Sequence, residues 1–136
     1  MTVLQGEGVS RGVASGRLRF LRRDAQAQPR REVADAEAEV ARFDKARGEA
    51  VVQLAKLYVD TKARLGEEKA LLFQIHQMML EDLDYCDSIT GMIRDEHVNA
   101  EYAVDQTAAQ FSEMFAQMDD DYMKERAADV LDVSRR

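Results

Sequence analysis

The sequence predicts a mostly α-helical protein, and three observations support this prediction. The chain of 136 residues contains 1 proline and 7 glycines, so little in it interrupts long helices. From Glu32 onward the apolar residues recur every three or four positions, which is the period of a helix with one buried face. Hydrophobic residues make up 46% and charged residues 33% of the chain, as in a globular domain that forms a core.

The first sixteen residues differ from the rest, because four of the seven glycines lie there. Around these glycines, residues 3–5 and 16–21 have the apolar character of short β-strands. Two strands alone are marginally stable in water, and no other segment of the chain has a strand pattern. We therefore expect this short β segment to belong to a sheet whose other strands lie outside the chain.

Two long helices are predicted next. The first runs from Glu32 to Leu65, where Gly66 is a stop signal, and the second runs unbroken from Glu67 to Ile93. The main apolar stripe predicted for the second helix consists of Leu72, Ile75, Met79, Leu83, Cys86, Thr90 and Ile93.

Two shorter helices follow. Asn99 is a good N-cap for the third, and the acidic run 119–121 ends that helix and caps a fourth. Packed as two antiparallel hairpins, the helices form a four-helix bundle that buries all four stripes. The fourth pattern runs into residues 135–136 without a stop signal, so together with the partnerless strands it indicates a fragment of a longer chain.

Charge is unevenly distributed along the chain. Between Arg11 and Arg31 there are seven arginines and one acid, whereas residues 32–136 contain 24 acids and 12 bases. An acidic field repels nucleic acid and speeds encounter with a basic protein, although a solvated acidic surface explains the same charges. The sequence has no apolar run that spans a membrane, no secretory signal, and a single cysteine, Cys86. We expect a cytoplasmic protein without nucleic-acid or membrane partners.

The sequence contains no self-contained catalytic or metal site. The two histidines, His76 and His97, have no matched Cys or His around them, and His76 lies off the main stripe as a surface histidine does. Gly6, Gly8 and Gly12 have the wrong spacing for a phosphate-binding loop.

The second helix carries a second apolar row beside its main stripe. The row repeats every seven residues and consists of Leu71, Met78, Tyr85 and Met92. Six carboxylates border it: Glu67, Glu68, Glu81, Asp82, Asp84 and Asp87. An apolar strip framed by acids suits docking of a basic, partly apolar protein, and burial of the helix on two sides explains it equally well.

Four segments of the chain are similar to one known family. They are GEEKALLFQIHQMMLED at 66–82, DDDYMKERAADVLD at 119–132, GEGVSRGVASG at 6–16, and Asn99-Ala-Glu-x-Ala-Val104. In order and spacing they resemble Enzyme I of the bacterial phosphoenolpyruvate-dependent sugar phosphotransferase system, over essentially the whole chain.

The resemblance implies a function for the intact protein. Enzyme I takes phosphate from phosphoenolpyruvate onto a histidine, using magnesium in a C-terminal barrel domain, and hands it to the phosphocarrier HPr. The resemblance divides this chain into residues 1–31, which begin an α/β phosphohistidine domain, and residues 32–136, a helical HPr-binding domain whose last helix is cut short. The Gly-Gly-x-x-Ser-His type motif of the phosphorylated histidine is absent. We therefore expect this chain alone to be inactive and to bind no cofactor, and the intact enzyme to be a homodimer through its C-terminal domain.

The resemblance also implies which residues bind HPr. Carboxylates that meet basic residues of HPr are Glu67, Glu68, Asp82 and Asp84; the apolar centre is Leu71, Met78, Met79 and Tyr85; polar contacts come from Lys69 and His76; and the fourth helix adds Met123 and Arg126. Two residues depart from the family pattern: Leu83 stands where many members have proline, and Tyr85 is bulkier than the usual aliphatic residue.

Two other hypotheses compete with docking. His76 could itself accept phosphate, which would make the chain an enzyme. Alternatively, the chain could be a helical interaction module that self-associates through its orphan strands or through an exposed Met-rich stripe.

Overall fold

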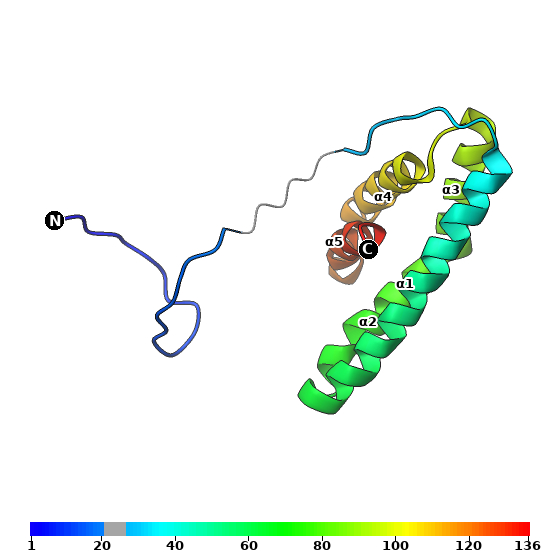
Figure 1. The fold of residues 1–136 in the computed structure, drawn as a ribbon. Coiled ribbons are helices and arrows are strands. Elements are labelled where there is room, and N and C mark those ends of the chain that lie inside the picture. The colour runs from blue at the N-terminus through cyan, green and yellow to red at the C-terminus, as the bar shows by residue number, and fades with distance from the viewer. Residues whose placement is uncertain (21–26) are drawn as a thin grey trace.

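The computed structural model describes residues 1–20 and 27–136, and confirms the mostly helical prediction. Within these ranges it contains five helices: α1 (Ala36–Leu65), α2 (Glu67–Leu80), α3 (Leu83–Glu96), α4 (Ala100–Ala116) and α5 (Asp121–Ser134). In Figure 1, α1 and α2 form one antiparallel hairpin and α4 and α5 form a second. The remaining helix, α3, packs mainly against α4 and α1 and so joins the two hairpins.

Helix termini lie where the sequence carries capping residues. Gly66 ends α1 with a φ of 93°, a conformation that favours glycine, as the sequence predicted. Asp120, within the predicted acidic run, caps α5 by accepting a hydrogen bond of 2.9 Å from the backbone N–H of Tyr122. Asn99 is the N-cap residue of α4, also as predicted, although its side chain bonds elsewhere.

The predicted second helix is in fact two helices, so the bundle has five helices rather than four. The chain leaves the helical conformation at Asp82, whose carboxylate accepts a 2.9 Å hydrogen bond from the backbone N–H of Tyr85 and thereby starts α3. Because the direction changes here, the predicted stripe does not continue across the break, and Leu83 is 75% exposed. Within α2, Leu72 of the same stripe is also 43% exposed. The buried face of α3 is instead formed by Tyr85, Ile89 and Ile93.

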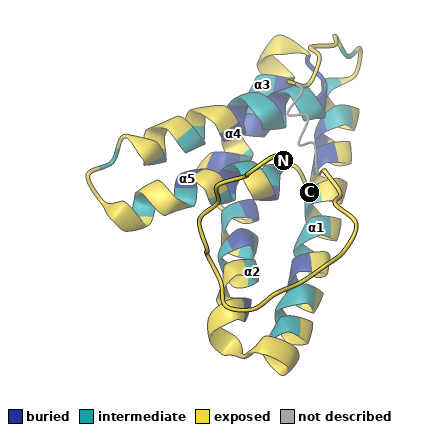
Figure 2. Ribbon diagram, turned by 90° about the vertical axis from the view of Figure 1, so that its left-hand side faces the viewer, coloured by how far each residue is buried: buried dark blue, intermediate teal, exposed yellow. Residues whose placement is uncertain are grey.

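The core lies where α3 meets the two hairpins. Figure 2 shows the buried residues on the facing sides of the helices and the exposed residues on their outer sides. The largest fully buried side chains come from α1, α3, the α3–α4 turn, α4 and α5: Leu54, Ile89, Ile93, Val98, Thr107 and Val130. No helix in the described ranges is long and apolar enough to cross a membrane.

The two predicted N-terminal strands are not formed. Residues 1–20 are exposed and contain no strand, and position 21, the end of the second predicted strand, lies outside the described residues. In Figure 1 this segment extends away from the helices. Two lone strands without a neighbouring sheet are not expected to pair, and the chain provides no other strand in its described ranges.

The segment before α1 is fixed to the α3–α4 turn. The backbone N–H of Val33 donates to the carbonyl of His97 at 2.8 Å, and the N–H of Asn99 donates to the carbonyl of Arg31 at 3.0 Å. The side chain of Asn99 completes the link, since its Oδ1 accepts from the N–H of Arg31 at 2.8 Å. These bonds hold the chain extended, so α1 begins four residues after the predicted start at Glu32.

An ion-pair network joins α1 to the start of α4. Arg42 donates two hydrogen bonds to the carboxylate of Glu101, at 2.8 and 2.7 Å, and a third of 2.6 Å to Glu39. Glu39 in turn accepts from the backbone N–H of Ala100 at 2.7 Å. The hydrogen bonds from Arg42 lower the pKa of Glu101 from 4.5 to about 2. Charge-assisted hydrogen bonds therefore hold α1 against the first turn of α4.

This network predicts acid-sensitive stability. The folded-state pKa of Glu101 lies below its unfolded value, so its contribution is present above about pH 4.5 and is lost as the pH falls toward 2. We expect Glu101→Gln to lower the free energy of unfolding at pH 7 by at most about 1 kcal/mol, because the side chain is 37% exposed and the pair is screened. Urea unfolding measured from pH 7 down to about pH 2 should show this difference shrinking.

Glu49→Gln is the control, since Glu49 is exposed on α1 and makes no ion pair among the described residues. A Glu101→Gln variant with the same pH dependence as the wild type would show that the network does not stabilise the folded state.

Candidate docking surface

The exposed side of α2 brings together several of the predicted docking residues. Leu71 and Met78 are seven residues apart, so they share one face of the helix, and they are 42% and 66% exposed. The acids Glu67 and Glu68 are exposed in the first turn, and Asp82 and Asp84 are exposed where α3 begins. We call this surface the α2–α3 face; it consists of Glu67, Glu68, Leu71, Met78, Asp82 and Asp84.

The carboxylates of this face differ in how far they are already paired. Glu67 accepts hydrogen bonds from Lys62 Nζ at 3.0 Å and from the hydroxyl of Tyr58 at 3.3 Å, and the Lys62 bond lowers the pKa of Glu67. Within the described part of the chain, the side chains of Glu68 and Asp84 make no ion pair or hydrogen bond. These two carboxylates are therefore free to meet the cations of a partner.

Tyr85 is not part of the surface, which corrects the expectation from the sequence. Its side chain is 2% exposed, its ring packs edge-on against Phe111 with centroids 5.8 Å apart, and its hydroxyl lies 2.7 Å from Ser134 Oγ. Burial raises the pKa of Tyr85. Since α2 ends at Leu80, the seven-residue row that was predicted to join Met78 to Tyr85 does not exist as one row.

The remaining predicted residues are distributed around this face. Lys69 is exposed beside the acids of the first turn of α2. Met79 is half-buried and packs against the core, so most of its side chain is not available to a partner. Met123 is half-buried in the first turn of α5.

His76 and Arg126 meet at a contact between α2 and α5. His76 was predicted to lie on the surface but is 8% exposed, because α5 packs over this side of α2. Its Nε2 lies 3.4 Å from Asp129 Oδ1, while Asp129 Oδ2 lies 2.6 Å from an Arg126 guanidinium nitrogen. The sequence analysis missed Asp129, although its spacing three residues after Arg126 is that of a helical ion pair.

The arrangement disfavours His76 as a phosphate acceptor. The imidazole is buried and its Nε2 faces a carboxylate, which repels an incoming phosphoryl group. Across residues 1–20 and 27–136, no group of three or more His, Cys, Asp or Glu side chains is placed to hold a metal ion.

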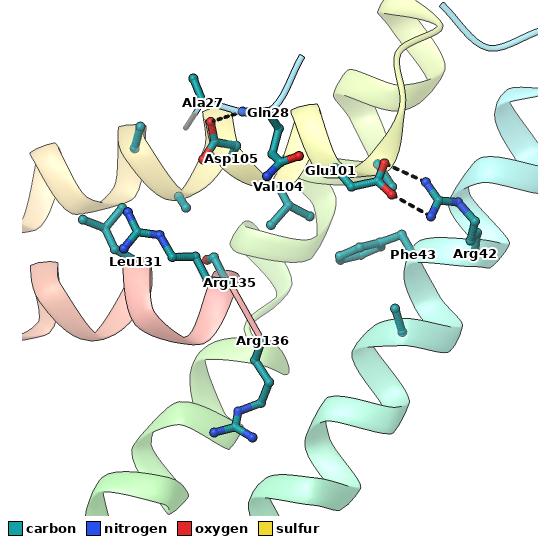
Figure 3. A pocket seen from close by; sticks show the side chains of 15 residues that line it. Ala27, Gln28, Arg42, Phe43, Glu101, Val104, Asp105, Leu131, Arg135 and Arg136 are labelled. Carbon is teal, nitrogen blue, oxygen red and sulfur yellow. Dashed lines mark hydrogen bonds and ion pairs between the residues drawn. The ribbon is translucent and has the colours of Figure 1, made fainter. Parts of the chain in front are cut away.

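A cavity lies on another side of the helices. It has a volume of about 650 Å³ and is lined by residues of α1, α4, the end of α5 and the segment 27–28 (Figure 3). The backbone N–H of Gln28 donates to Asp105 at 3.3 Å at its edge, and Arg135 and Arg136 also line it. Among the described residues that line it there is no residue of α2 or α3 and none of the predicted docking residues.

One protein-family model matches most of the chain. It is described as PEP-utilising enzyme, N-terminal, and it matches residues 5–126.

Curated proteins match the chain over nearly its full length. A phosphoenolpyruvate-protein phosphotransferase of Bacillus sp. (strain S) is 42% identical over 133 residues, which cover 98% of this chain and 23% of that protein. The proteins of the same name from Geobacillus stearothermophilus and Bacillus subtilis (strain 168) are 41% and 37% identical, over 98% and 100% of this chain and 23% and 24% of their own length. The chain thus spans about a quarter of these relatives.

Two solved structures share the fold. A solution structure of Enzyme I matches with a TM-score of 0.74 and 28% identity, over 81% of this chain and 46% of that one. A structure described as the N-terminal domain of Enzyme 1 - Nitrogen matches with a TM-score of 0.73 and 26% identity, over 79% and 45% of the two chains.

Proposed function

The chain belongs to the family of PEP-utilising enzymes, of which it matches the N-terminal part, and we propose that it is the HPr-docking part of a phosphoenolpyruvate-protein phosphotransferase. The resemblance to Enzyme I found in the sequence is confirmed by these comparisons. The partner follows from the chemistry of the α2–α3 face and from what the resemblance implies.

The observation that supports docking is an exposed apolar pair bordered by unpaired carboxylates. Met78 and Leu71 expose apolar surface on the same side of α2, at 66% and 42%. Glu68 and Asp84 are exposed near its two ends and make no ion pair within the described chain. A partner with an apolar patch bordered by lysines or arginines complements such a surface, and HPr is the basic partner that the resemblance implies.

The two kinds of residue contribute differently to binding. Carboxylates at the rim mainly raise the association rate, and salt weakens this effect. A flexible, polarisable methionine at the centre gains affinity by burying apolar surface against the partner. We therefore assign the affinity mainly to Met78 and the salt dependence to Glu68 and Asp84.

The docking proposal predicts a loss of affinity in Met78→Ala. We expect this variant to bind unphosphorylated HPr about tenfold more weakly, since truncating a central residue of an interface commonly costs more than about 1 kcal/mol. The dissociation constant should be measured by titration calorimetry at low and moderate salt, with helix content checked by circular dichroism. The matched control is Val59→Ala, because Val59 is similarly exposed, at 63%, on the outer side of α1.

Normal binding by Met78→Ala, or equal weakening by Val59→Ala, would place the HPr site elsewhere. NMR titration of the isotope-labelled chain would then locate it.

We propose that phosphate transfer itself resides in the part of the relatives that this chain does not span. The histidine motif is absent here, and His76 is buried beside Asp129. Magnesium supplies its chemistry in the barrel domain that the resemblance implies, and dimerisation of the intact cytoplasmic enzyme is assigned to the same C-terminal region.

This division predicts that the chain alone takes up no phosphate. After incubation with phosphoenolpyruvate and magnesium, intact mass spectrometry should show the unmodified mass, because no acceptor histidine is available. A phosphate adduct on wild type that disappears in His76→Gln would assign the transfer to His76 and overturn the division.

A second function, self-association, is favoured by the N-terminal segment. Seven large apolar residues among residues 1–20 are exposed: Met1, Val3, Leu4, Val9, Val13, Leu18 and Phe20. A segment of this composition can pair with the same segment of another copy when no sheet is available.

Self-association predicts a concentration-dependent mass. Light scattering of the full chain should rise toward the dimer mass as concentration increases, whereas a variant lacking residues 1–26 should stay monomeric. That variant retains all five helices, so it also controls for association through the helices. A monomeric full chain at the highest concentration would exclude this function.

A further inference from the structure

Asp129 is a half-buried carboxylate that links the two hairpins. Its side chain is 15% exposed, and those of its two partners, His76 and Arg126, are 10% and 14% exposed. One oxygen faces Nε2 of His76 on α2 at 3.4 Å, and the other faces the guanidinium of Arg126 on its own helix at 2.6 Å. Asp129 therefore connects Arg126 to α2, the helix that carries most of the α2–α3 face.

Arg126 is held on two sides but retains unused donors. Its guanidinium lies over the ring of Tyr122, 4.6 Å from the centroid, and Tyr122 is itself 56% exposed. Its Nη1 is buried 2.6 Å from Asp129 Oδ2, and its Nε is buried without a hydrogen-bond acceptor among the described residues. The third nitrogen, Nη2, is not buried and lies 3.6 Å from the exposed Glu125, the one other carboxylate near it in the described part of the chain, so its two N–H donors are available to a partner.

We propose that Asp129 is a positioning residue for docking: it holds the Arg126 guanidinium between Tyr122 and α2, so that its Nη2 donors bind an acceptor group of the partner. This inference rests on the proposed docking function. A long side chain that is already fixed loses less conformational entropy on binding than a freely rotating one.

Stability alone does not account for this arrangement. A buried ion pair gives little net stabilisation, because desolvation of both charges offsets their attraction. The buried Nε of Arg126, which has no acceptor among the described residues, adds a further cost in free energy. Holding the guanidinium so that Nη2 faces a partner is a role that accounts for this costly arrangement.

The inference is tested by a double-mutant cycle on HPr affinity. We expect Asp129→Asn to weaken binding about fivefold in the wild-type background and to have little effect in an Arg126→Gln background, because the two residues then no longer act together. The matched control is Asp132→Asn, which removes the same charge from an exposed position one turn further along α5. It should leave affinity within about twofold of wild type.

A readout independent of HPr follows the arginine itself. In the free protein, NMR relaxation of the Arg126 Nε–H group should show an ordered side chain in the wild type and a mobile one in Asp129→Asn. If Asp129 only stabilised the fold, Asp129→Asn would lower the unfolding temperature without selectively making the Arg126 side chain mobile. Should Asp129→Asn fail to fold, Asp129→Glu keeps the charge, shifts the carboxylate by one methylene, and should weaken binding less than fivefold with the same dependence on Arg126.

The outcomes separate the two proposals. The positioning role is overturned, and docking left intact, if the wild type binds HPr and Asp129→Asn weakens binding equally in both backgrounds. It is also overturned if the Arg126 Nε–H group is as ordered in Asp129→Asn as in the wild type. A wild-type chain that does not bind HPr overturns the docking function, and the positioning role with it.

Discussion

At Glu81 the chain leaves α2, and two residues later it enters α3 in a new direction. The hydrogen bond from the Tyr85 N–H to the Asp82 carboxylate fixes this change. Because of it, Tyr85, Ile89 and Ile93 turn inward, where α3 packs against both α1 and α4 and so joins the two hairpins in addition to the direct α1–α4 and α2–α5 contacts. The same change of direction leaves Asp82 and Asp84 exposed beside the end of α2. One local bond thus shapes both the core and the acidic end of the α2–α3 face.

Much of the fold could be predicted from the sequence, because the relevant signals are local. Gly66 and the acidic run at 119–121 mark helix ends through backbone conformation and capping, which depend on a few neighbouring residues. The break at Asp82 carries no glycine or proline, and the helical period continues through it, so the sequence predicted one helix. Tertiary packing favours the break, because one straight helix would carry the buried residues of α3 away from α4.

The site was predictable to the extent that it depends on single helix faces. Leu71 and Met78 are exposed on one side of α2, as their spacing indicates. Burial of Tyr85 and His76 depends instead on which helix crosses which, and α5 covers His76 through Asp129, a contact between residues 53 positions apart. Periodicity within α2 contains no information on that crossing. For the same reason Asp129 escaped notice: its importance comes from a partner on another helix.

The segment before α1 is attached to the α3–α4 turn, and this attachment limits how far residues 1–20 can lie from the helices. Hydrogen bonds fix the chain at Arg31, and Gln28 is bonded to Asp105 on α4. The seven steps between residues 20 and 27 span at most about 25 Å even if fully extended. Any folded unit that includes residues 1–20 is therefore tethered within a small volume beside the helices, at an effective concentration on the order of millimolar. A contact between that unit and the helices that is too weak to detect between separate molecules would then hold the two together for part of the time. The same weak contact would also allow them to separate.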